Sequence, residues 1–419
     1  MKKLAKVLIA IAVLFSFVSC ASTSQKKADE EARQYELLIN QFVDLTYASN
    51  FVPQNRAQEI VYDMQFGWNL GNTFDATPWN DAQNFGNDSE KQWGQPITTQ
   101  EMIQGLKRLG IKTIRIPISW HNHLEDNNYT ISRAWMGRVQ QVVDWAYEEG
   151  MYVIINIHHD NYDSKKKNFG YGKGFYLSEE CKDESLKFIT RVWEQVSETF
   201  KNYDDKIIFE VLNEPRLQGD RHEWNYMPSC ATCKEAMNIL NEFTQKALDT
   251  IRASGGNNAN RLVMIPSIAG SPDAALHNDF KLPKDSAENA LAVSVHMYTP
   301  YDFAMGVPGS TIFTEGHKGS LNSYFNRLNM TFVSKGIPVV IGEMGATNKG
   351  NLEDRAAWFG YFVQHARRYG MTACVWDNGA SDPSTSKSEK YGYYNRLAQE
   401  WYFPLLMDVA LKASSKVEY

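Results

Sequence analysis

Two glutamates directly follow runs of strand-forming residues, Glu214 after Ile207–Leu212 and Glu343 after Ile337–Gly342. Apolar runs of this length are typical of buried strands, so each carboxylate emerges from the core at a strand end. Burying a carboxylate without a partner costs several kcal/mol. Each glutamate is therefore exposed to solvent, paired with an arginine, or placed where its pKa is tuned for proton transfer.

Polar and aromatic side chains also stand at the ends of other strand-forming runs. They are Asn72 after the first run, Arg115 within the second, His158 and His159 after the third, Asn213 after the fourth, His296 and Tyr298 after the sixth, and Trp376 after the eighth. Taken singly, Arg115 has a structural explanation as a buried ion pair, and His296 has one as a hydrogen-bonded core histidine. Seven of eight runs ending in such groups argue instead for one shared site.

The elements that must position these residues alternate along the chain. Eight runs are predicted as buried strands, at 66–73, 111–118, 152–157, 207–212, 261–266, 291–295, 337–342 and 371–376. Helices are predicted at 98–110, 132–150, 184–200, 234–253, 320–335, 354–369 and 392–411, with one or two between Tyr35 and Met64 and a short segment near Ser286. This alternation predicts an α/β fold, a (β/α)8 TIM barrel forming a single catalytic domain, whose functional groups lie at the carboxyl ends of the strands.

A doubly wound sheet is the alternative that the alternation leaves open. Such a fold has a phosphate-binding glycine loop after its first strand, whereas Gly67-Trp-Asn-Leu-Gly-Asn72 does not match GxGxxG. The net charge of −6 argues against a nucleic-acid partner held by phosphate contacts. The 11 Trp, 21 Tyr and 21 Phe residues exceed what a core needs and suit stacking on sugar rings or other flat apolar faces.

The first residues are predicted to direct export. Three lysines within the first six residues precede the apolar run Val7–Val18, which is too short to anchor the chain across a bilayer. Phe17-Val-Ser-Cys20 resembles a bacterial lipoprotein box, in which Cys20 becomes the lipidated first residue. We therefore expect an exported protein that contacts a membrane only through its lipid anchor, at the outer membrane, the cell surface or in the periplasm.

These features predict three segments. Residues 1–19 form a lipoprotein signal peptide, 20–50 a tether and helical lead-in, and 51–415 the catalytic barrel. The polar stretch 21–31 is expected to be a flexible tether.

Four cysteines remain after Cys20, namely Cys181, Cys230, Cys233 and Cys374. Cys230-Ala-Thr-Cys233 is a single CxxC with neither a second pair nor suitably spaced histidines, which argues against a zinc site. A short-range disulfide in a loop is the better expectation for an exported protein, although the pairing cannot be deduced from sequence.

Several motifs together resemble glycoside hydrolase family 5, the large cellulase family. They are Asn213-Glu214-Pro215, Ile341-Gly-Glu-Met-Gly345, Arg115, His158, His296-Met-Tyr298 and Trp376. The stretches 67–76 and 93–96 are similar to the subfamily 4 branch, whose members cleave cellulose, mixed-linkage β-glucan, xyloglucan and sometimes xylan. The resemblance implies a monomeric, retaining endo-β-1,4-glucanase that uses no cofactor or metal, with Glu214 as acid/base and Glu343 as nucleophile.

The resemblance also implies roles for the other strand-end residues. Arg115 and Tyr298 would donate hydrogen bonds to Glu343, while Asn213 would bind the sugar 2-hydroxyl and Asn72 would contact substrate. The three histidines His158, His159 and His296 would position the sugar and the carboxylates, and Trp376 would form a stacking floor. Trp79 or Trp93 would extend the cleft, or else pack within the loops. Glu214 is expected to be the carboxyl with the raised pKa.

Three other readings compete with this one. A xyloglucan-specific endoglucanase, or a xylanase or mannanase of the same family, would share all these motifs. A metal-dependent barrel hydrolase could use His158-His159-Asp160 with His296 and the two glutamates. Such enzymes usually begin with His-x-His at the end of the first strand, where this chain has Asn69 and Asn72. A non-catalytic surface lipoprotein that binds glycans is disfavoured because both carboxylates are present.

Overall fold

The computed structural model describes residues 25–44, 51–77, 86–162, 174–306, 308–385 and 389–415. Cys20 and Trp79 lie outside these ranges. The chain divides into two units, Met1–Tyr47 and Ala48–Tyr419. In the first unit, residues 25–39 form a helix, so the expectation of a flexible tether through Glu31 is wrong there. Pairs at helical spacing stabilise this polar segment, for example Gln25 with Asp29 and Arg33 with Glu30.

The second unit is built on eight parallel strands that close into a barrel in chain order. They are β1 (Phe66–Asn69), β2 (Thr113–Ile116), β3 (Tyr152–Asn156), β4 (Ile207–Glu210), β5 (Val263–Pro266), β6 (Leu291–Met297), β7 (Val339–Met344) and β8 (Thr372–Val375). The last strand pairs with the first, and Phe66 lies opposite Ala373. The predicted (β/α)8 barrel is confirmed.

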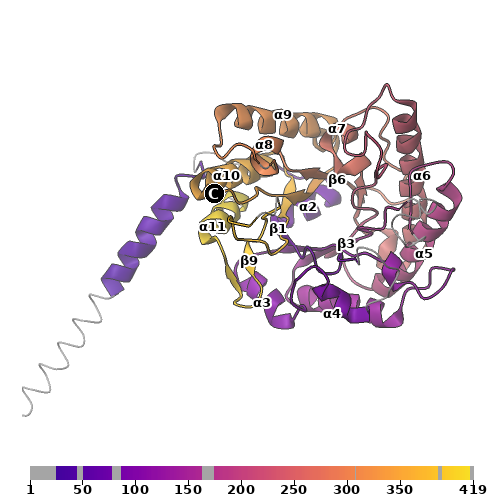
Figure 1. Ribbon diagram of the computed structural model, residues 1–419, viewed down its shortest axis with the longest axis horizontal. Coiled ribbons are helices and arrows are strands. Elements are labelled where there is room, and N and C mark those ends of the chain that lie inside the picture. The colour runs from indigo at the N-terminus through magenta and orange to yellow at the C-terminus, as the bar shows by residue number, and fades with distance from the viewer. Residues whose placement is uncertain are drawn as a thin grey trace, which may run out of the picture. The chain divides into compact units, whose positions relative to one another are not determined.

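Helices surround the barrel, as Figure 1 shows for α3 to α6 and α9 to α11. The helices are α2 (Arg56–Asp63), α3 (Gln100–Arg108), α4 (Arg133–Glu148), α5 (Lys182–Phe200), α6 (Ala231–Ala253), α7 (Pro272–Ala275), α8 (Tyr301–Ala304), α9 (Glu315–Thr331), α10 (Leu352–Arg368) and α11 (Pro404–Ser414). Short 3-10 helices are η1 (Gly86–Lys91), η2 (His121–His123), η4 (Gly256–Ala259), η5 (Ile268–Gly270) and η6 (Val333–Lys335). Within the described ranges, no helix combines the length and apolar character needed to cross a membrane.

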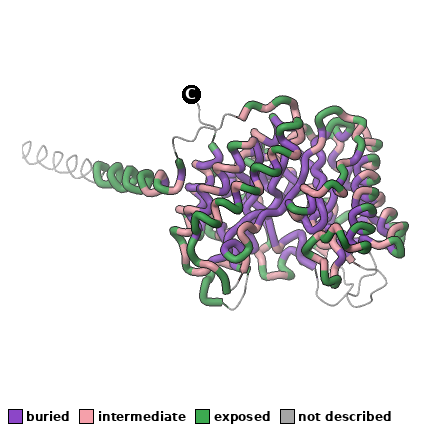
Figure 2. Tube along the Cα trace, turned by 90° about the horizontal axis from the view of Figure 1, so that it is seen from above, coloured by how far each residue is buried: buried purple, intermediate pink, exposed green. Residues whose placement is uncertain are grey.

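Helix α2 closes the end of the barrel where the strands begin. The hydroxyl of Thr113 donates to the carbonyl of Met64 over 2.7 Å, and the hydroxyl of Thr372 donates to the carbonyl of Val61. Ile60 and Val61 pack with apolar residues from six strands, namely Ile154, Ile208, Met264, Ala292, Val340 and Cys374. Figure 2 shows the buried residues gathered at the centre of the barrel and the exposed ones on its outer surface. A functional site must therefore lie at the opposite end, where the strands finish.

Three predicted helical segments differ markedly from those observed. The helix expected from Ser320 begins earlier, at Glu315, because Thr314 and His317 form a reciprocal capping box that satisfies the first backbone N–H groups. The described residues near Ser286 contain no helix, and the connection between β5 and β6 carries η5 and α7 instead.

The helix predicted over 392–411 starts only at Pro404. Its first part is held extended because the backbone N–H groups of Tyr393 and Tyr394 donate to Asp377 over 3.1 and 2.8 Å. That part contains a small antiparallel pair, β9 (Tyr394–Asn395) and β10 (Glu400–Trp401). Bonds to a distant carboxylate therefore override the local helical spacing.

Candidate active site

Arg115 on β2 lies at the centre of a hydrogen-bonded network inside the barrel, with no exposed side-chain surface. Its Nε donates to Glu210 over 2.9 Å, and its Nη1 donates over 2.9 Å to both Asn69 and Glu343. Its Nη2 donates to Oδ1 of Asn213 over 2.6 Å. Although burial favours the neutral form, the negative charges of Glu210 and Glu343 raise the pKa of Arg115 above its ordinary value. The guanidinium therefore stays charged and holds Glu343 in place.

The strand register explains why these residues meet. Asn69 lies directly opposite Arg115 across the β1–β2 pair, and His296 lies opposite Glu343 across β6–β7. The register shifts between Val295 and His296, and such an irregularity re-aims the following side chains. His296 and Glu343 therefore reach the same end of the barrel side by side.

Glu343 is 5% exposed and is held at both carboxylate oxygens. Arg115 donates to Oε1, and the hydroxyl of Tyr298 donates to Oε2 over 2.9 Å. Burial and the charge of Glu343 raise the pKa of Tyr298 well above its ordinary value, so the phenol remains a donor. These two donors hold Glu343 in one orientation, with a small part of it open to the barrel mouth.

Glu214 follows β4 and forms a close contact with His296. The Nδ1 atom of His296 lies 2.7 Å from Oε1 of Glu214, and Arg216 lies 3.8 Å from Oε2. Burial by itself would raise the pKa of Glu214, but the hydrogen bond and charge of His296 together with the charge of Arg216 lower it. The prediction that Glu214 has a raised pKa is therefore wrong.

The pKa of the imidazole in this pair shifts in the opposite direction. Burial disfavours the imidazolium, but the charge of Glu343 and the contact with Glu214 outweigh it and raise the pKa of His296. Oxygen atoms of Glu214 and Glu343 and a ring nitrogen of His296 all lie within 4.8 Å of one another. Retaining glycosidases hold their two carboxyl groups about 5–5.5 Å apart, whereas inverting enzymes leave about 6.5–9.5 Å for a water. The close approach matches the retaining arrangement.

Trp376 and His158 form an aromatic surface beside the carboxylates. Their rings are parallel within 2°, with centroids 5.8 Å apart. A Cβ atom at Gly71 would stand 2.9 Å from the indole, so the absence of a side chain there lets Trp376 lie against the end of β1. Burial, with the nearby His159 and Arg115, lowers the pKa of His158 well below its ordinary value, so it is neutral.

The remaining predicted rim residues lie on the loops after β1 and β3. Trp93 donates its indole N–H to the carbonyl of Thr77 over 2.9 Å, and its ring centroid lies 5.4 Å from that of His159. Burial, with Arg216 nearby, lowers the pKa of His159 to about 3. Asn72 occupies the turn after β1 with φ of 56° and is half-buried. Trp93 therefore packs within the loops, and its contribution to the cleft stays a prediction.

Sequence reasoning missed Glu210, the last residue of β4, which is fully buried. Its carboxylate accepts from Arg115, from Asn156 over 2.9 Å and from Ser294 over 2.6 Å. One signal was available, because Glu210 is the single charge within the apolar run Ile207–Leu212. A charge there needs a buried counter-charge, and Arg115 supplies it.

The loop after β4 contains a second missed group, Arg216. It donates to the backbone carbonyl of Glu214 over 3.0 Å and to the carboxylate of Glu223 over 2.9 Å. Its guanidinium stacks over Trp224 at 4.3 Å. No sequence pattern signalled this cluster, because its members are brought together by loop geometry.

The donor set at the barrel mouth fits a catalytic metal poorly. Asp160, considered as a ligand with His158 and His159, instead contacts His121 over 2.7 Å. Glu343 is already engaged by the buried charge of Arg115 over 2.9 Å, which would repel a divalent cation bound to the same carboxylate. The arrangement suits a two-carboxylate reaction better.

The expected loop disulfide between Cys230 and Cys233 is not formed, and all four cysteines of the described ranges are free thiols. Cys230 is the N-cap of α6, and its sulfur accepts the backbone N–H of Cys233 over 3.4 Å. The sulfur of Cys230 thus caps α6, and both cysteines lie at the start of this helix and not within a loop.

Comparison with known families gives a match over most of the barrel. Residues 73–382 match the family model described as Cellulase (glycosyl hydrolase family 5). This span includes both glutamates, Arg115, His296 and Trp376.

Individual relatives cover a similar range. The chain is 41% identical over 365 residues to Endoglucanase A of Clostridium longisporum. The aligned region covers 86% of this chain and 66% of that protein. One similar solved structure is a mutant of the glycoside hydrolase 5 lichenase from Caldicellulosiruptor sp. F32 in complex with cellotetraose. It is 39% identical to this chain, with a TM-score of 0.83, and the match covers 89% of this chain and 99% of the other. A GH5-4 broad specificity endoglucanase from Ruminococcus champanellensis with bound cellotriose is 37% identical, with a TM-score of 0.77, covering 85% and 99%.

Proposed function

Because the chain belongs to glycosyl hydrolase family 5, we propose that it cleaves the backbone of β-1,4-glucans internally, as a retaining endoglucanase. The observation that carries this proposal is the close pair of carboxylates at the ends of β4 and β7, with oxygens of Glu214 and Glu343 within 4.8 Å. Both groups have the hydrogen-bonding partners that a double displacement needs. A purely glycan-binding protein would not require them.

In the first step Glu343 attacks the anomeric carbon and Glu214 delivers a proton to the departing glycosidic oxygen. The bond to the leaving sugar breaks, and an ester forms between the remaining sugar and Glu343. Arg115 and Tyr298, each 2.9 Å from Glu343, hold the attacking oxygens in one orientation. In the second step Glu214 takes a proton from water, which attacks the same carbon and releases Glu343.

The proton for the first step is shared between Glu214 and His296. The 2.7 Å contact lets His296 keep the proton at rest and pass it to Glu214 as the glycosidic oxygen gains negative charge. The charge of Glu343 helps to hold that proton on His296. When Glu343 becomes a neutral ester, its negative charge no longer stabilises the imidazolium of His296. Glu214 then competes for the proton with a more weakly basic neighbour.

Sugar positioning is assigned to groups around the two carboxylates. Oδ1 of Asn213 accepts from Arg115, and we assign its amide nitrogen to the sugar 2-hydroxyl. Trp376 supplies an aromatic face at the cleavage point, and His158 and His159 are neutral donors or acceptors beside it. Trp93 extends this surface toward the loop after β1.

The substrate is a β-1,4-linked glucan, with cellulose and mixed-linkage glucan as the preferred members. The similar solved structures include a lichenase and an endoglucanase described as of broad specificity, which supports acceptance of both. We further propose a monomer that is exported and lipid-anchored through Cys20. Replacing Cys20 with Ser should move the activity from the membrane fraction to the soluble fraction.

The deciding experiment measures hydrolysis of carboxymethyl cellulose, mixed-linkage glucan, xyloglucan, xylan and glucomannan while NMR follows the anomeric configuration of the first product. Internal cleavage of a β-1,4-glucan with retention is the expected result. Inversion would remove Glu343 as nucleophile, and activity confined to xylan or glucomannan would overturn the glucan assignment.

A further inference from the structure

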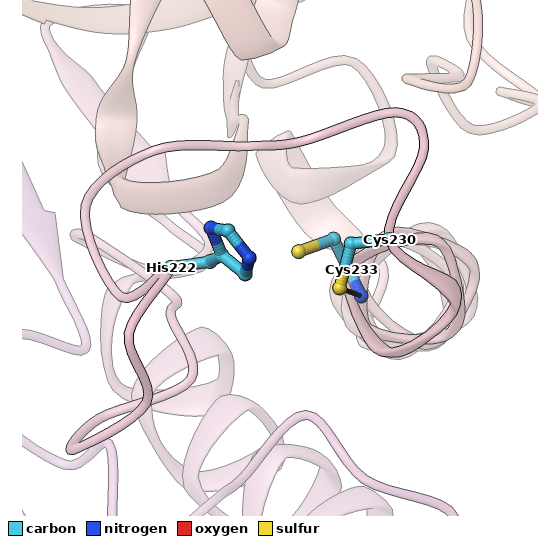
Figure 3. A group of neighbouring side chains, drawn as sticks. All are labelled: His222, Cys230 and Cys233. Carbon is cyan, nitrogen blue, oxygen red and sulfur yellow. Dashed lines mark hydrogen bonds between the residues drawn. The ribbon is translucent and has the colours of Figure 1, made fainter.

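A cluster of three potential metal ligands lies outside the catalytic network, in the connection between β4 and α6. Ligand atoms of His222, Cys230 and Cys233 lie within 4.8 Å of one another. Figure 3 shows the His222 imidazole directed toward the two sulfurs at the start of the helix. We propose that these three side chains bind one zinc ion.

The local backbone brings the three ligands together. Cys230 caps α6, and its sulfur accepts the N–H of Cys233, which puts both thiols on the first helical turn. His222 precedes the cysteines in the chain and lies in a tight bend, where the Asp220 carboxylate accepts its backbone N–H over 2.8 Å. The loop brings its ring next to this helical turn. The spacing of His222 from the CxxC is set by this loop fold, so it matches none of the familiar zinc patterns in sequence.

The chemistry of the ligands selects the metal. Two thiolates and an imidazole are soft and borderline ligands that favour zinc and disfavour calcium or magnesium. Zinc bonds of about 2.0–2.3 Å separate tetrahedral ligands by roughly 3.3–3.8 Å, so closure from within 4.8 Å requires only side-chain rotation. On binding, both thiols release a proton to solvent and the imidazole binds in its neutral form, with water in the fourth position.

Two of the three proposed ligands are accessible to solvent. Cys230 and His222 are both half-buried, so an ion can reach them from solvent. Zinc would then draw in the buried Cys233.

Zinc at this position would fix the loop that flanks the acid/base residue. His222 immediately precedes Glu223, whose carboxylate holds Arg216 over 2.9 Å, and Arg216 contacts the backbone of Glu214. The ion would therefore tie the loop that carries Arg216 and Trp224 to the start of α6. Its role is structural, because no ligand touches the catalytic carboxylates.

The test counts zinc and thiols in the purified full-length protein. We expect one zinc per chain by atomic emission and two thiols that react with a chromogenic disulfide only after a chelator is added. Cobalt in place of zinc should produce a thiolate-to-metal charge-transfer absorption. A wild-type protein that holds no zinc at micromolar free zinc, or one in which Cys230 and Cys233 are joined as a disulfide, would overturn the proposal.

Substitutions separate this site from adventitious binding. His222→Ala and Cys230→Ser should each weaken zinc binding by about tenfold or more and abolish the cobalt absorption, while hydrolysis of a β-glucan reports that the variants are folded. Cys181→Ser is the matched control, because Cys181 is likewise the N-cap residue of a helix, α5, without a side-chain capping bond, and is not part of the cluster. Unchanged zinc affinity in His222→Ala would rule the site out.

Discussion

The Nδ1 atom of His296 lies 2.7 Å from Oε1 of Glu214, which makes the acid/base residue half of a proton-sharing pair. The same nitrogen lies 3.6 Å from Oε2 of Glu343. His296 therefore contacts both catalytic carboxylates and responds to the charge of each. The protonation of this pair, more than that of Glu214 alone, should govern activity as pH rises.

The first prediction concerns the alkaline limb of the activity profile. The pKa of His296 is raised by Glu343 and Glu214, so the active pair keeps its proton above the usual histidine range. In His296→Asn the proton must reside on the carboxyl of Glu214 alone, which releases it at lower pH. We expect the alkaline limb of kcat/KM to move to lower pH. His277→Asn, whose ring contacts Tyr226, should leave the limb in place, and an unmoved limb in His296→Asn would refute the shared proton.

The second prediction separates the two glutamates. Glu343→Gln should abolish turnover on every substrate, because no nucleophile remains. Glu214→Gln should lose about 10²–10⁴-fold in kcat/KM on polysaccharide but recover partly on aryl glycosides whose leaving group needs no proton. Equal losses on both substrates would show that Glu214 is not the proton donor.

The third prediction tests the hydrogen bond from Tyr298 to Glu343, which spans 2.9 Å. Tyr298→Phe keeps the ring and removes only the donor. A hydrogen bond to a charged group contributes about 1.5–3 kcal/mol, so kcat should fall by about 10- to 100-fold. Tyr393→Phe removes a buried hydroxyl that donates to the backbone of Ala346 instead. A comparable loss of kcat there would mean that both substitutions act through folding.

The fourth prediction concerns the free energy of unfolding. Arg115→Met leaves Glu210 and Glu343 buried without their counter-charge, and breaking a buried pair costs about 3–5 kcal/mol. Adding Glu210→Gln removes one of the uncompensated charges and should recover part of that loss. Arg327→Met breaks a half-exposed pair with Asp273 and should cost under about 1 kcal/mol. Denaturant unfolding measures all three, and a double variant no more stable than Arg115→Met would contradict the pairing.

The fifth prediction uses Asp75, which is fully buried after β1. Burial raises its pKa from 3.8 to about 7, so the folded protein binds this proton more tightly than the unfolded chain. The stability that the protonated carboxyl confers is then lost as pH rises from 3.8 to about 7. Asp75→Asn cannot titrate, so its free energy of unfolding should fall less over that window. Parallel curves for the variant and the wild type would show that Asp75 does not carry this dependence.

Much of the architecture was readable from local patterns. Apolar runs separated by helical segments predicted eight parallel strands, because the spacing of apolar residues along the sequence reflects which face of a strand or helix is buried. Parallel strands in a barrel end at one rim, so the positions of Glu214 and Glu343 in the chain placed them together. The segments 25–31 and 392–403 were misjudged because side-chain pairs and bonds to Asp377 are invisible to local composition.

What the sequence by itself determined is the kind of fold and the two carboxylates at its rim, since both follow from the order of elements along the chain. The tertiary structure alone decided which groups touch. Glu210 faces Arg115, His296 approaches Glu214 after an irregularity in β6, and His222 returns to the cysteines of α6. Coulombic and hydrogen-bonding energies change over fractions of an ångström, so the lowered pKa of Glu214 could only emerge from the folded geometry.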